Sequence, residues 1–443
     1  MKKHLILLLL AVVLISTVSA QEVSEKQEIA VFSLSYSDWT IPSGALGIVD
    51  QQIIEVLTNL GRFQIKGLEF RLRADDVLDF IDMIKDVNES NMVIDEKYRF
   101  GEAVFTEADF EELVASFIIV VPALTFYDSI VETTGDGAVW EVELQTAFTF
   151  IHVKDSTTLA QFSIDTFGTG ETQREATLDA AKAISGQLDY ELRSIEEFQL
   201  KSGIIEVLPG SRVIIELGEG MGLAKGDEFS IMQTKTLNSG HTIKESTGLL
   251  VISDVKQDVS YGRVLYSDGR VNPGDQLAEV PRMGIDVSAY GTMLFNIPED
   301  GPISLDGGLV GVKSVFARGF YDMRPFVGVE VPLVDGTLNS LWPGIPLSAY
   351  VGGELMWFLG RLQIEPSIAF GVTGLVPLTD TDEFVMSHIG GKAGVALNWM
   401  LTDSLRLFID GGYTHWFSIA PDWLPSVDAF GGIFAGLGVT FKL

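Results

Sequence analysis

Residues 429–443 read AFGGIFAGLGVTFKL, and this stretch decides the fold of the C-terminal part of the chain. From residue 433 onwards every second side chain is apolar. These side chains are Ile433, Ala435, Leu437, Val439, Phe441 and Leu443. The residues between them are Gly432, Phe434, Gly436, Gly438, Thr440 and Lys442. Successive side chains of a β-strand point to opposite faces, so this period of two gives the strand one apolar face. A run of this length predicts a strand that crosses a membrane as part of a β-barrel.

The same alternation recurs throughout residues 284–443. Eight segments show it, and they begin near Ile285, Leu305, Arg324, Leu347, Leu362, His388, Leu405 and Ala429. Long connections alternate with short ones, and the long ones are residues 298–306, 334–347, 375–388 and 418–428. Long loops of such barrels face outward and short turns face the periplasm. We therefore predict a C-terminal eight-stranded antiparallel transmembrane β-barrel at the outer membrane.

The alternation also predicts which charged side chains point into the barrel. The acidic ones are Asp286, Glu330, Glu354, Glu365 and Asp410. The basic ones are Lys313, Arg324, Lys392, Arg406 and Lys442. Eight strands enclose an interior just wide enough for side chains, and these charges balance. A charge-paired plug is therefore favoured over an open pore.

Four tryptophans are candidates for anchors at the two membrane interfaces, where aromatic belts occur. Trp357 and Trp399 lie near the predicted periplasmic ends, and Trp416 and Trp423 lie near the outer ends. On this strand count, loop alternation and the ending Gly438–Leu443, residues 284–443 resemble the small outer-membrane barrels of the OmpA type. The ending departs from that family, because it places Phe441 two residues before a final leucine.

The N-terminus has the composition of a secretory signal peptide over residues 1–20. Lys2 and Lys3 precede an apolar run, and Val18-Ser19-Ala20 supplies small residues for cleavage. The chain has no cysteine, so lipid attachment, disulfides and thiolate metal sites are excluded. Residues 21–200 hold 34 acidic and 12 basic side chains, and the whole chain has a net charge of -31. Such a chain repels phosphate backbones, so nucleic acid is not expected as a partner.

Residues 21–200 have the pattern of a periplasmic α/β domain. A strand at 29–34 precedes a helix ending at Gly61, and a long final helix carries Ala181, Ile184, Leu188 and Leu192 on one stripe. A short helix is also expected from about residue 75 to residue 85. The segments Ile29–Phe32, Gly61–Phe63 and Gly168–Gly170 resemble the curli assembly and transport family (CsgG) and the N-terminal domain of TolB. The absence of cysteine departs from CsgG, which is a lipoprotein.

Residues 203–281 are predicted to form a small all-β domain. Turn pairs Gly226-Asp227 and Gly274-Asp275 separate short apolar strands. This segment resembles the SH3-like C-terminal domain of the flagellar assembly protein T family (FlgT), which also follows a TolB-like domain. Only a few residues separate it from the first barrel strand, so we expect it directly beneath the barrel.

The sequence contains no recognisable catalytic constellation, and no cofactor is expected. The mature histidines are scattered, and Gly168-Thr169-Gly170 lacks the lysine of a phosphate loop. Asp380, Asp382 and Glu383 are weak calcium candidates, but their spacing matches no calcium loop and a solvated acidic loop is favoured.

The sequence thus favours a non-catalytic scaffold or assembly protein of an envelope machine, of the flagellar or secretion type. It would contact outer-membrane lipid through the barrel, and envelope proteins or its own copies through the periplasmic domains. The alternative is a subunit of an oligomeric outer-membrane export channel.

Overall fold

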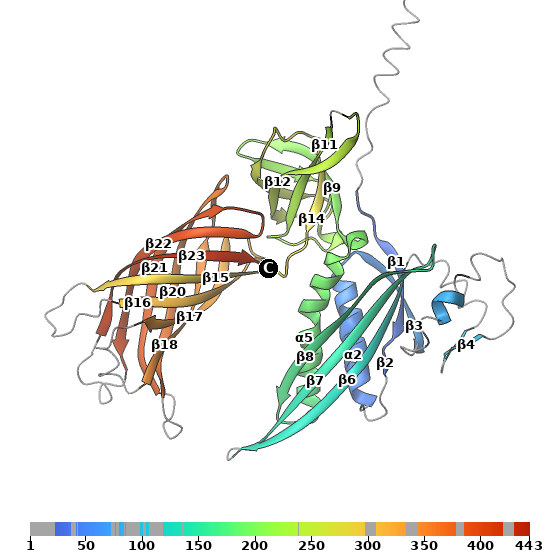
Figure 1. The fold of residues 1–443 in the computed structure, drawn as a ribbon, viewed down its shortest axis with the longest axis horizontal. Helices are drawn as coiled ribbons and strands as arrows, with labels where there is room; N and C mark the ends of the chain where they lie inside the picture. The colour runs from blue at the N-terminus through green and yellow to red at the C-terminus, as the bar shows by residue number, and fades with distance from the viewer. Residues whose placement is uncertain are drawn as a thin grey trace, which may run out of the picture.

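The computed structural model describes residues 23–36, 41, 43–71, 76, 79–83, 85, 98–100, 103–105, 118–134, 137–237, 239–296, 307–333, 344–377, 385–419 and 429–443. The chain is mostly β, with few helices, and forms three units (Figure 1). The N-terminal unit and a large barrel extend from a smaller barrel towards the same side, and the C-terminus lies where the three units meet. No helix among the described residues is long and apolar enough to cross a membrane.

The N-terminal unit is built on a mixed sheet with the strand order β3-β1-β6-β7-β8. Its strands are β1 (Gln27–Ser33), β2 (Ser35–Tyr36), β3 (Phe63–Arg71), β6 (Ile118–Thr134), β7 (Gly137–His152) and β8 (Thr157–Gly170). β1 pairs in parallel with β3 and β6, whereas β6, β7 and β8 form an antiparallel meander. A separate short pair, β4 (Tyr98–Phe100) and β5 (Ala103–Phe105), completes the strands of this unit.

Two helices cover one face of this sheet. They are α2 (Ser43–Asn59) and α5 (Gln173–Ser194), and they bury a shared apolar core against the strands. Helix α5 begins at a capping box, in which the Thr172 side chain and Glu175 satisfy each other's backbone N–H groups. Ala176, Ala180 and Ile184 then recur four residues apart and are fully buried, as an amphipathic helix requires.

The central unit is a closed barrel of six strands in the order β10-β13-β12-β11-β14-β9. Its strands are β9 (Lys201–Leu208), β10 (Arg212–Ile215), β11 (Glu228–Thr236), β12 (Thr242–Val255), β13 (Ser260–Ser267) and β14 (Gln276–Val280). Short 3-10 helices flank its start, η2 (Glu196–Phe198) and η3 (Glu219–Met221). Its core includes Val213, Phe229, Ile231 and Leu250, all fully buried.

The C-terminal unit is a closed eight-stranded antiparallel barrel. Its strands are β15 (Ile285–Asn296), β16 (Gly307–Phe316), β17 (Met323–Leu333), β18 (Gly344–Leu355) with its continuation β19 (Trp357–Leu359), β20 (Leu362–Pro377), β21 (Val385–Met400), β22 (Leu405–Ser418) and β23 (Ala429–Lys442). The first strand pairs with the last, β15 with β23, and β18 pairs with β20 to close the ring. The sequence analysis predicted this barrel and its strand starts to within a few residues.

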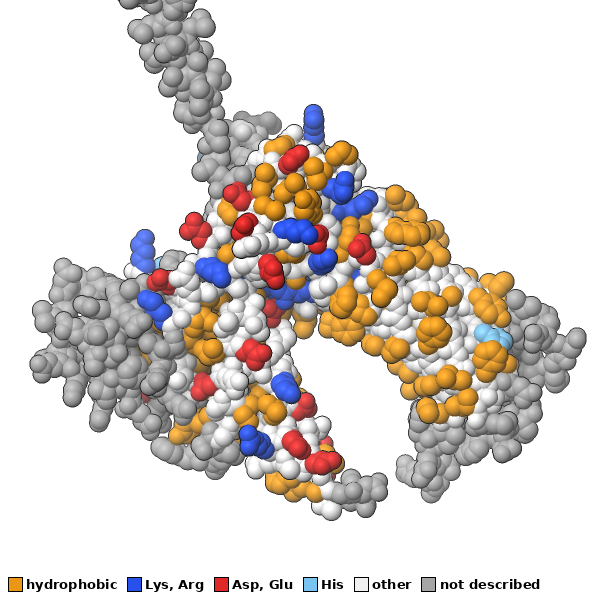
Figure 2. All heavy atoms as spheres, turned by 180° about the vertical axis from the view of Figure 1, so that it is seen from behind, with side chains coloured by type: hydrophobic (Ala, Val, Ile, Leu, Met, Phe, Trp, Pro, Cys, Tyr) orange, Lys and Arg blue, Asp and Glu red, His pale blue; other side chains and the backbone are white. Residues whose placement is uncertain are grey.

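The barrel has its apolar side chains on the outside. On β23, Ile433 and Leu437 are 52% and 68% exposed, whereas Phe434, Thr440 and Lys442 are buried. Figure 2 shows hydrophobic side chains over the visible outer wall of this barrel, with almost no charged ones among them. This inversion of the usual soluble pattern is typical of a strand surface that faces lipid.

Helix α2 corresponds to the helix predicted to end at Gly61, and α5 corresponds to the predicted final helix of the N-terminal unit. Gly61 has a left-handed φ of 71°, which favours glycine after a helix. The predicted helix at residues 75–85 falls mostly outside the described residues, as does the signal peptide. The segment predicted as SH3-like has a closed six-stranded barrel, with left-handed glycines at Gly226 and Gly274.

Gly168 provides a test of how α5 packs on the sheet. A methyl group added there would lie 2.2 Å from the backbone nitrogen of Ala180. Gly168→Ala should therefore push α5 from β8 and destabilise the unit by about 1–3 kcal/mol. Hydrogen exchange of the α5 amides in the full chain should become faster.

Gly186→Ala, in helix α5 itself, is the control for the strand substitution Gly168→Ala, because its added methyl group meets no atom within 4 Å. It should slow exchange, since alanine favours a helix by about 0.5–1 kcal/mol over glycine. Equal exchange in the two variants would contradict the close packing at Gly168.

Candidate functional site: the charged barrel interior and the junction at its mouth

The interior of the eight-stranded barrel holds two networks of charged side chains. The strands place their inward residues towards one another because every second side chain points inside. The network nearer the mouth, defined as the barrel end at the central unit, contains Asp286, Lys313, Arg324, Glu354, Glu365 and Arg406. The second contains Glu330 and Lys392. All of these are residues that the sequence predicted to point inward.

Arg324 lies at the centre of the first network. Its guanidinium is 3.0 Å from a carboxylate oxygen of Asp286 and 3.2 Å from one of Glu365, and it also bonds Glu354. The ammonium of Lys313 reaches the other oxygen of Glu354 at 2.8 Å. A planar guanidinium has five donors, so it can join several carboxylates that a lysine could not.

Arg406 links the same acids from the opposite wall. It bonds Asp286, lies 3.3 Å from Glu365 and donates to the side-chain carbonyl of Gln363 at 2.9 Å. Both arginines are less than a tenth exposed. Buried charges are costly unless they are paired and hydrogen-bonded. Carboxylates pair both guanidiniums here, although the Nε atom of each arginine has no hydrogen-bond partner among the described atoms.

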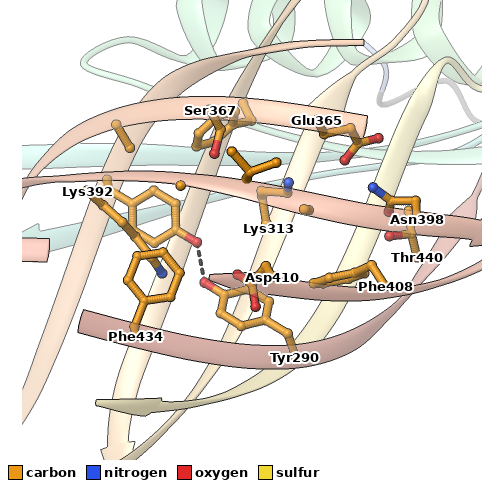
Figure 3. Close-up of a pocket in the computed structure, with 16 residues that line it drawn as sticks. Tyr290, Lys313, Glu365, Ser367, Lys392, Asn398, Phe408, Asp410, Phe434 and Thr440 are labelled. Atoms are coloured by element: carbon orange, nitrogen blue, oxygen red, sulfur yellow. Dashed lines mark hydrogen bonds between the residues drawn. The ribbon is translucent and has the colours of Figure 1, made fainter. Parts of the chain in front are cut away.

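The second network lies farther from the mouth, and Figure 3 shows its Lys392 beside Tyr290, Asp410 and Phe434. Lys392 forms an ion pair with Glu330, which also accepts a hydrogen bond of 2.8 Å from the Tyr290 hydroxyl. Tyr290 and Tyr350 bond each other through their hydroxyls. The ammonium of Lys392 lies 4.8 Å from the centre of the Phe434 ring, within the range of a cation–π contact.

Asp410 lines the cavity left between these side chains, together with Lys313 and Lys392. One of its carboxylate oxygens is buried without a hydrogen-bond partner among the described atoms. The cavity measures about 50 Å³. That volume holds about one or a few water molecules, so the described interior is filled by side chains.

Lys442 lines a cavity at the mouth together with Asp286, Arg324 and Arg406, as predicted, and its ammonium also reaches the central unit. It bonds Glu228, the first residue of β11 in the six-stranded barrel. Arg282 lies 3.4 Å from the same Glu228 carboxylate and donates to the backbone carbonyl of Lys442 at 3.1 Å. The charge network of the barrel therefore continues into the central unit.

Arg193, near the end of α5, connects the N-terminal unit to the same place. It is 1% exposed and bonds Asp189, Glu279 of β14 and the backbone carbonyl of Arg282. Glu279 also forms an ion pair of 2.7 Å with Arg62, which is buried beside Phe198. All three units thus meet around these arginines; we call this region the junction.

Asp227 and Arg318 form the second half of the junction. Arg318, in the turn between β16 and β17, lies 3.1 Å from Asp227 and 2.5 Å from Asp189. Burial raises the pKa of Asp227, and the positive charge of Arg318 opposes this effect. The carboxylates of Asp227 and Asp189 in turn raise the pKa of Arg318 against the effect of its own burial.

The six-stranded barrel also contacts the short turns around the mouth. The Tyr266 hydroxyl bonds Asp403, and the Arg361 guanidinium lies 3.6 Å above the Tyr266 ring. Burial and the Asp403 carboxylate raise the pKa of Tyr266. An apolar cluster that joins Leu249 and Met400 underlies these polar contacts. The central unit is therefore packed directly against the barrel mouth.

Two glycines permit the closest approaches between the units. A methyl group on Gly226 would lie 2.2 Å from the carbonyl oxygen of Ala317 in the barrel. One on Gly222 would lie 1.9 Å from the carbonyl oxygen of Leu60 in the N-terminal unit. Both glycines also have left-handed φ angles, so no other residue fits either position without strain.

The four tryptophans predicted as interface anchors differ in their exposure. Trp357 and Trp399 are 57% and 52% exposed on the outer wall near the mouth. The prediction for Trp416 is wrong, because its side chain is buried and lies against Gly390. It is an even-numbered residue of β22, and even-numbered residues there point inward, as Arg406 and Phe408 do. Trp423 lies outside the described residues.

The weak calcium candidates Asp380, Asp382 and Glu383 also lie outside the described residues. Among the described ones, no group of histidine and acidic side chains has the arrangement of a metal site.

The junction is not evident from the sequence. Arg62, Arg193, Asp227 and Glu279 lie on four separate segments, and their partners are distant in sequence. Asp227 was interpreted only as a turn residue after Gly226. The available signal was the position of these charges on otherwise apolar segments, which indicates buried pairing without naming the partner.

Comparison with known proteins yields structural similarity only. No protein-family model matches, and no curated protein sequence matches. Neisserial surface protein A shares 14% identity over 36% of this chain and 97% of its own, with a TM-score of 0.26. The N-terminal β-barrel domain of Pseudomonas aeruginosa OprF shares 12% identity over 36% of this chain and 96% of its own, with a TM-score of 0.24. A PelC dodecamer subunit from Paraburkholderia phytofirmans shares 13% identity over 38% and 91%, with a TM-score of 0.20. Similarity this low carries no functional inference.

The Lys392–Glu330 pair offers a test of the barrel interior. Lys392→Met should leave the Glu330 carboxylate buried without its cation and destabilise the barrel by about 3 kcal/mol. Adding Glu330→Gln should recover most of that loss, because a neutral amide can still bond Tyr290. Urea unfolding in detergent measures both, and a double variant no more stable than the single one would show that the pair is not coupled.

Arg193 offers a test of the junction. Arg193→Met leaves Glu279 and Asp227 with fewer cationic partners and should weaken the junction by about 3 kcal/mol. Trypsin should then cut after Arg282, whose guanidinium is otherwise bonded to Ser404 and Asp403, and release a fragment beginning at Met283.

Arg174→Met is the control, because Arg174 is exposed near the start of the same helix. This variant should be as resistant to trypsin as the unmodified chain. Resistance of Arg193→Met at equal trypsin concentration would show that the junction does not depend on this arginine.

Proposed function

We propose that this chain is a non-catalytic scaffold of the outer membrane, anchored by the eight-stranded barrel and holding its other two units in the periplasm. The single observation that carries the proposal is the pairing of an apolar outer wall with a filled interior. Such a barrel is suited to hold a protein in a membrane and unsuited to pass solutes.

The outer wall supports the membrane location. Large apolar side chains are exposed on every strand, including Met293, Val312, Val329, Val351, Phe370, Val395, Ile409 and Leu437. Exposed apolar surface of this extent is unfavourable in water and favourable in lipid. A closed barrel leaves no unpaired strand edge, which lipid requires.

The positions of the turns support the orientation. The connections at the mouth are short, and the central unit packs against that end, where the N-terminal unit joins it at the junction. Short turns of outer-membrane barrels face the periplasm. The N-terminal and central units would then lie on the periplasmic side, where the predicted signal peptide would deliver them.

The junction supports a scaffold role. It fixes the N-terminal unit relative to the membrane through buried ion pairs and glycine contacts. A surface held in one orientation beneath the membrane is suited to positioning other envelope proteins. The resemblance of residues 21–200 to CsgG and TolB, and of residues 203–281 to FlgT, agrees with such an assembly role.

An oligomeric export channel is the alternative, and the filled interior argues against it. Single-channel recordings would decide between them, since the scaffold predicts no conductance above that of protein-free bilayers.

Cysteine labelling of whole cells tests the orientation. Thr381→Cys, in the connection between β20 and β21 at the end away from the mouth, should react with a membrane-impermeant thiol reagent. Gln257→Cys, exposed on the six-stranded barrel, should react only after the outer membrane is opened. The native chain has no cysteine and serves as the blank. Labelling of Gln257→Cys before Thr381→Cys would invert the proposed topology.

A further inference from the structure

Strand β8 forms one edge of the N-terminal sheet and lies on the side of that sheet towards the eight-stranded barrel (Figure 1). It has 14 residues, and no other strand among the described residues pairs with its outer edge. Soluble proteins protect such edges with lysine, proline, bulges or short length. The sequence of β8, TTLAQFSIDTFGTG, contains neither lysine nor proline, and its register with β7 is regular from Ala160 to Gly170.

The backbone of β8 presents hydrogen-bonding groups at this edge. The N–H of Thr169 donates to the Asp179 carboxylate of α5 at 3.1 Å, so it points away from β7. N–H groups alternate in direction along an antiparallel strand. Those of Ser163, Asp165 and Phe167 therefore point outward as well.

The sheet face beside this edge is acidic and apolar. Asp128 of β6 lies opposite Glu143 of β7, and Glu143 lies opposite Phe167 of β8. Phe167 is 67% exposed and Ile130 is 56% exposed. Acids directly opposite each other across a strand pair repel, and no lysine or arginine occurs on β6, β7 or β8 to offset them.

We propose that the edge of β8 binds an extended, basic segment of another envelope protein, which adds a strand to the sheet. Main-chain groups of the added strand would pair with Ser163, Asp165 and Phe167. Its lysine or arginine side chains would lie on the face that carries Glu143, Asp165 and Phe167, and its alternate apolar side chains would lie on the opposite face, beside Ile164 and Thr166. The proposal rests on the scaffold function, whose partner it describes.

Charge selects this occupant over a second copy of the chain. Pairing β8 with another β8 would bring two acidic faces together, and like charges across an interface cost affinity. A basic strand gains both the main-chain bonds and the electrostatic attraction. Strand addition of this kind takes its affinity from the main chain and its specificity from alternate side chains.

The test uses the full chain in detergent and a fluorescent peptide of about ten residues that alternates lysine and valine, long enough to span most of the edge. Fluorescence anisotropy should show binding. A peptide with the same lysines but with proline in place of the valines cannot form a strand and should bind at least about tenfold more weakly. Equal binding of the two peptides would reduce the interaction to charge alone and overturn the proposal.

Two variants examine the edge and the face separately. Ser163→Pro removes one outward N–H and should weaken binding by about tenfold, while hydrogen exchange in α5 stays unchanged. Asp165→Lys with Glu143→Lys should abolish binding of the lysine peptide and allow binding of a glutamate–valine peptide. Asp258→Lys with Glu206→Lys, on exposed positions of the six-stranded barrel, makes the same change in net charge and should have no effect.

Two further results would overturn the proposal. The first is unchanged binding by Ser163→Pro, and the second is a dimer of the native chain that Ser163→Pro dissociates, which would make a second copy the occupant. Peptide binding does not depend on where the protein lies in the cell, so these outcomes are distinct from failure of the outer-membrane orientation.

Discussion

The interior of an eight-stranded barrel has room for side chains and little else, and the rest of the structure follows from that constraint. Because the outer wall is apolar, the strands direct their charged residues inward, where water cannot solvate them. Most of these charges have an opposite charge within hydrogen-bonding distance, whereas one carboxylate oxygen of Asp410 has no hydrogen-bond partner among the described atoms. Arg324 and Arg406 form such pairs from opposite walls by sharing the Asp286 and Glu365 carboxylates.

The same requirement extends beyond the barrel. Lys442 pairs with Glu228 of the six-stranded barrel, and Arg282 and Arg193 continue the contacts to helix α5. Buried ion pairs of this kind add little net stability compared with apolar packing, but removing one partner is costly. The junction therefore defines how the units are oriented more than how strongly they are held. The proposed scaffold role needs a defined orientation, and the glycine contacts at Gly222 and Gly226 restrict the orientation further.

The sequence predicted the barrel well because its pattern has a period of two that any lipid-facing strand must keep. It predicted the inward charges for the same reason, and the misplaced Trp416 shows the cost of departing from that rule. The alternation on β22 already assigned even-numbered residues to the interior, and only the position of Trp416 near a strand end suggested an interface. The junction could not be predicted, because Arg193 and Glu279 are distant in sequence and periodicity carries no information about contacts between units. The pairing of Lys442 outside the interior was missed for the same reason.

The pairing of β15 with β23 has a consequence for biogenesis. The first and last strands of the barrel are neighbours, so the ring is open until the end of the chain has been inserted. Lys442 belongs to that last strand, and it reaches Glu228 only once β23 is in register. This one contact between the two barrels therefore forms only in a chain whose last strand is in place. A chain halted before its last strand would bury Glu228 at the mouth without the ammonium of Lys442, and Arg282 would be its remaining basic partner among the described residues.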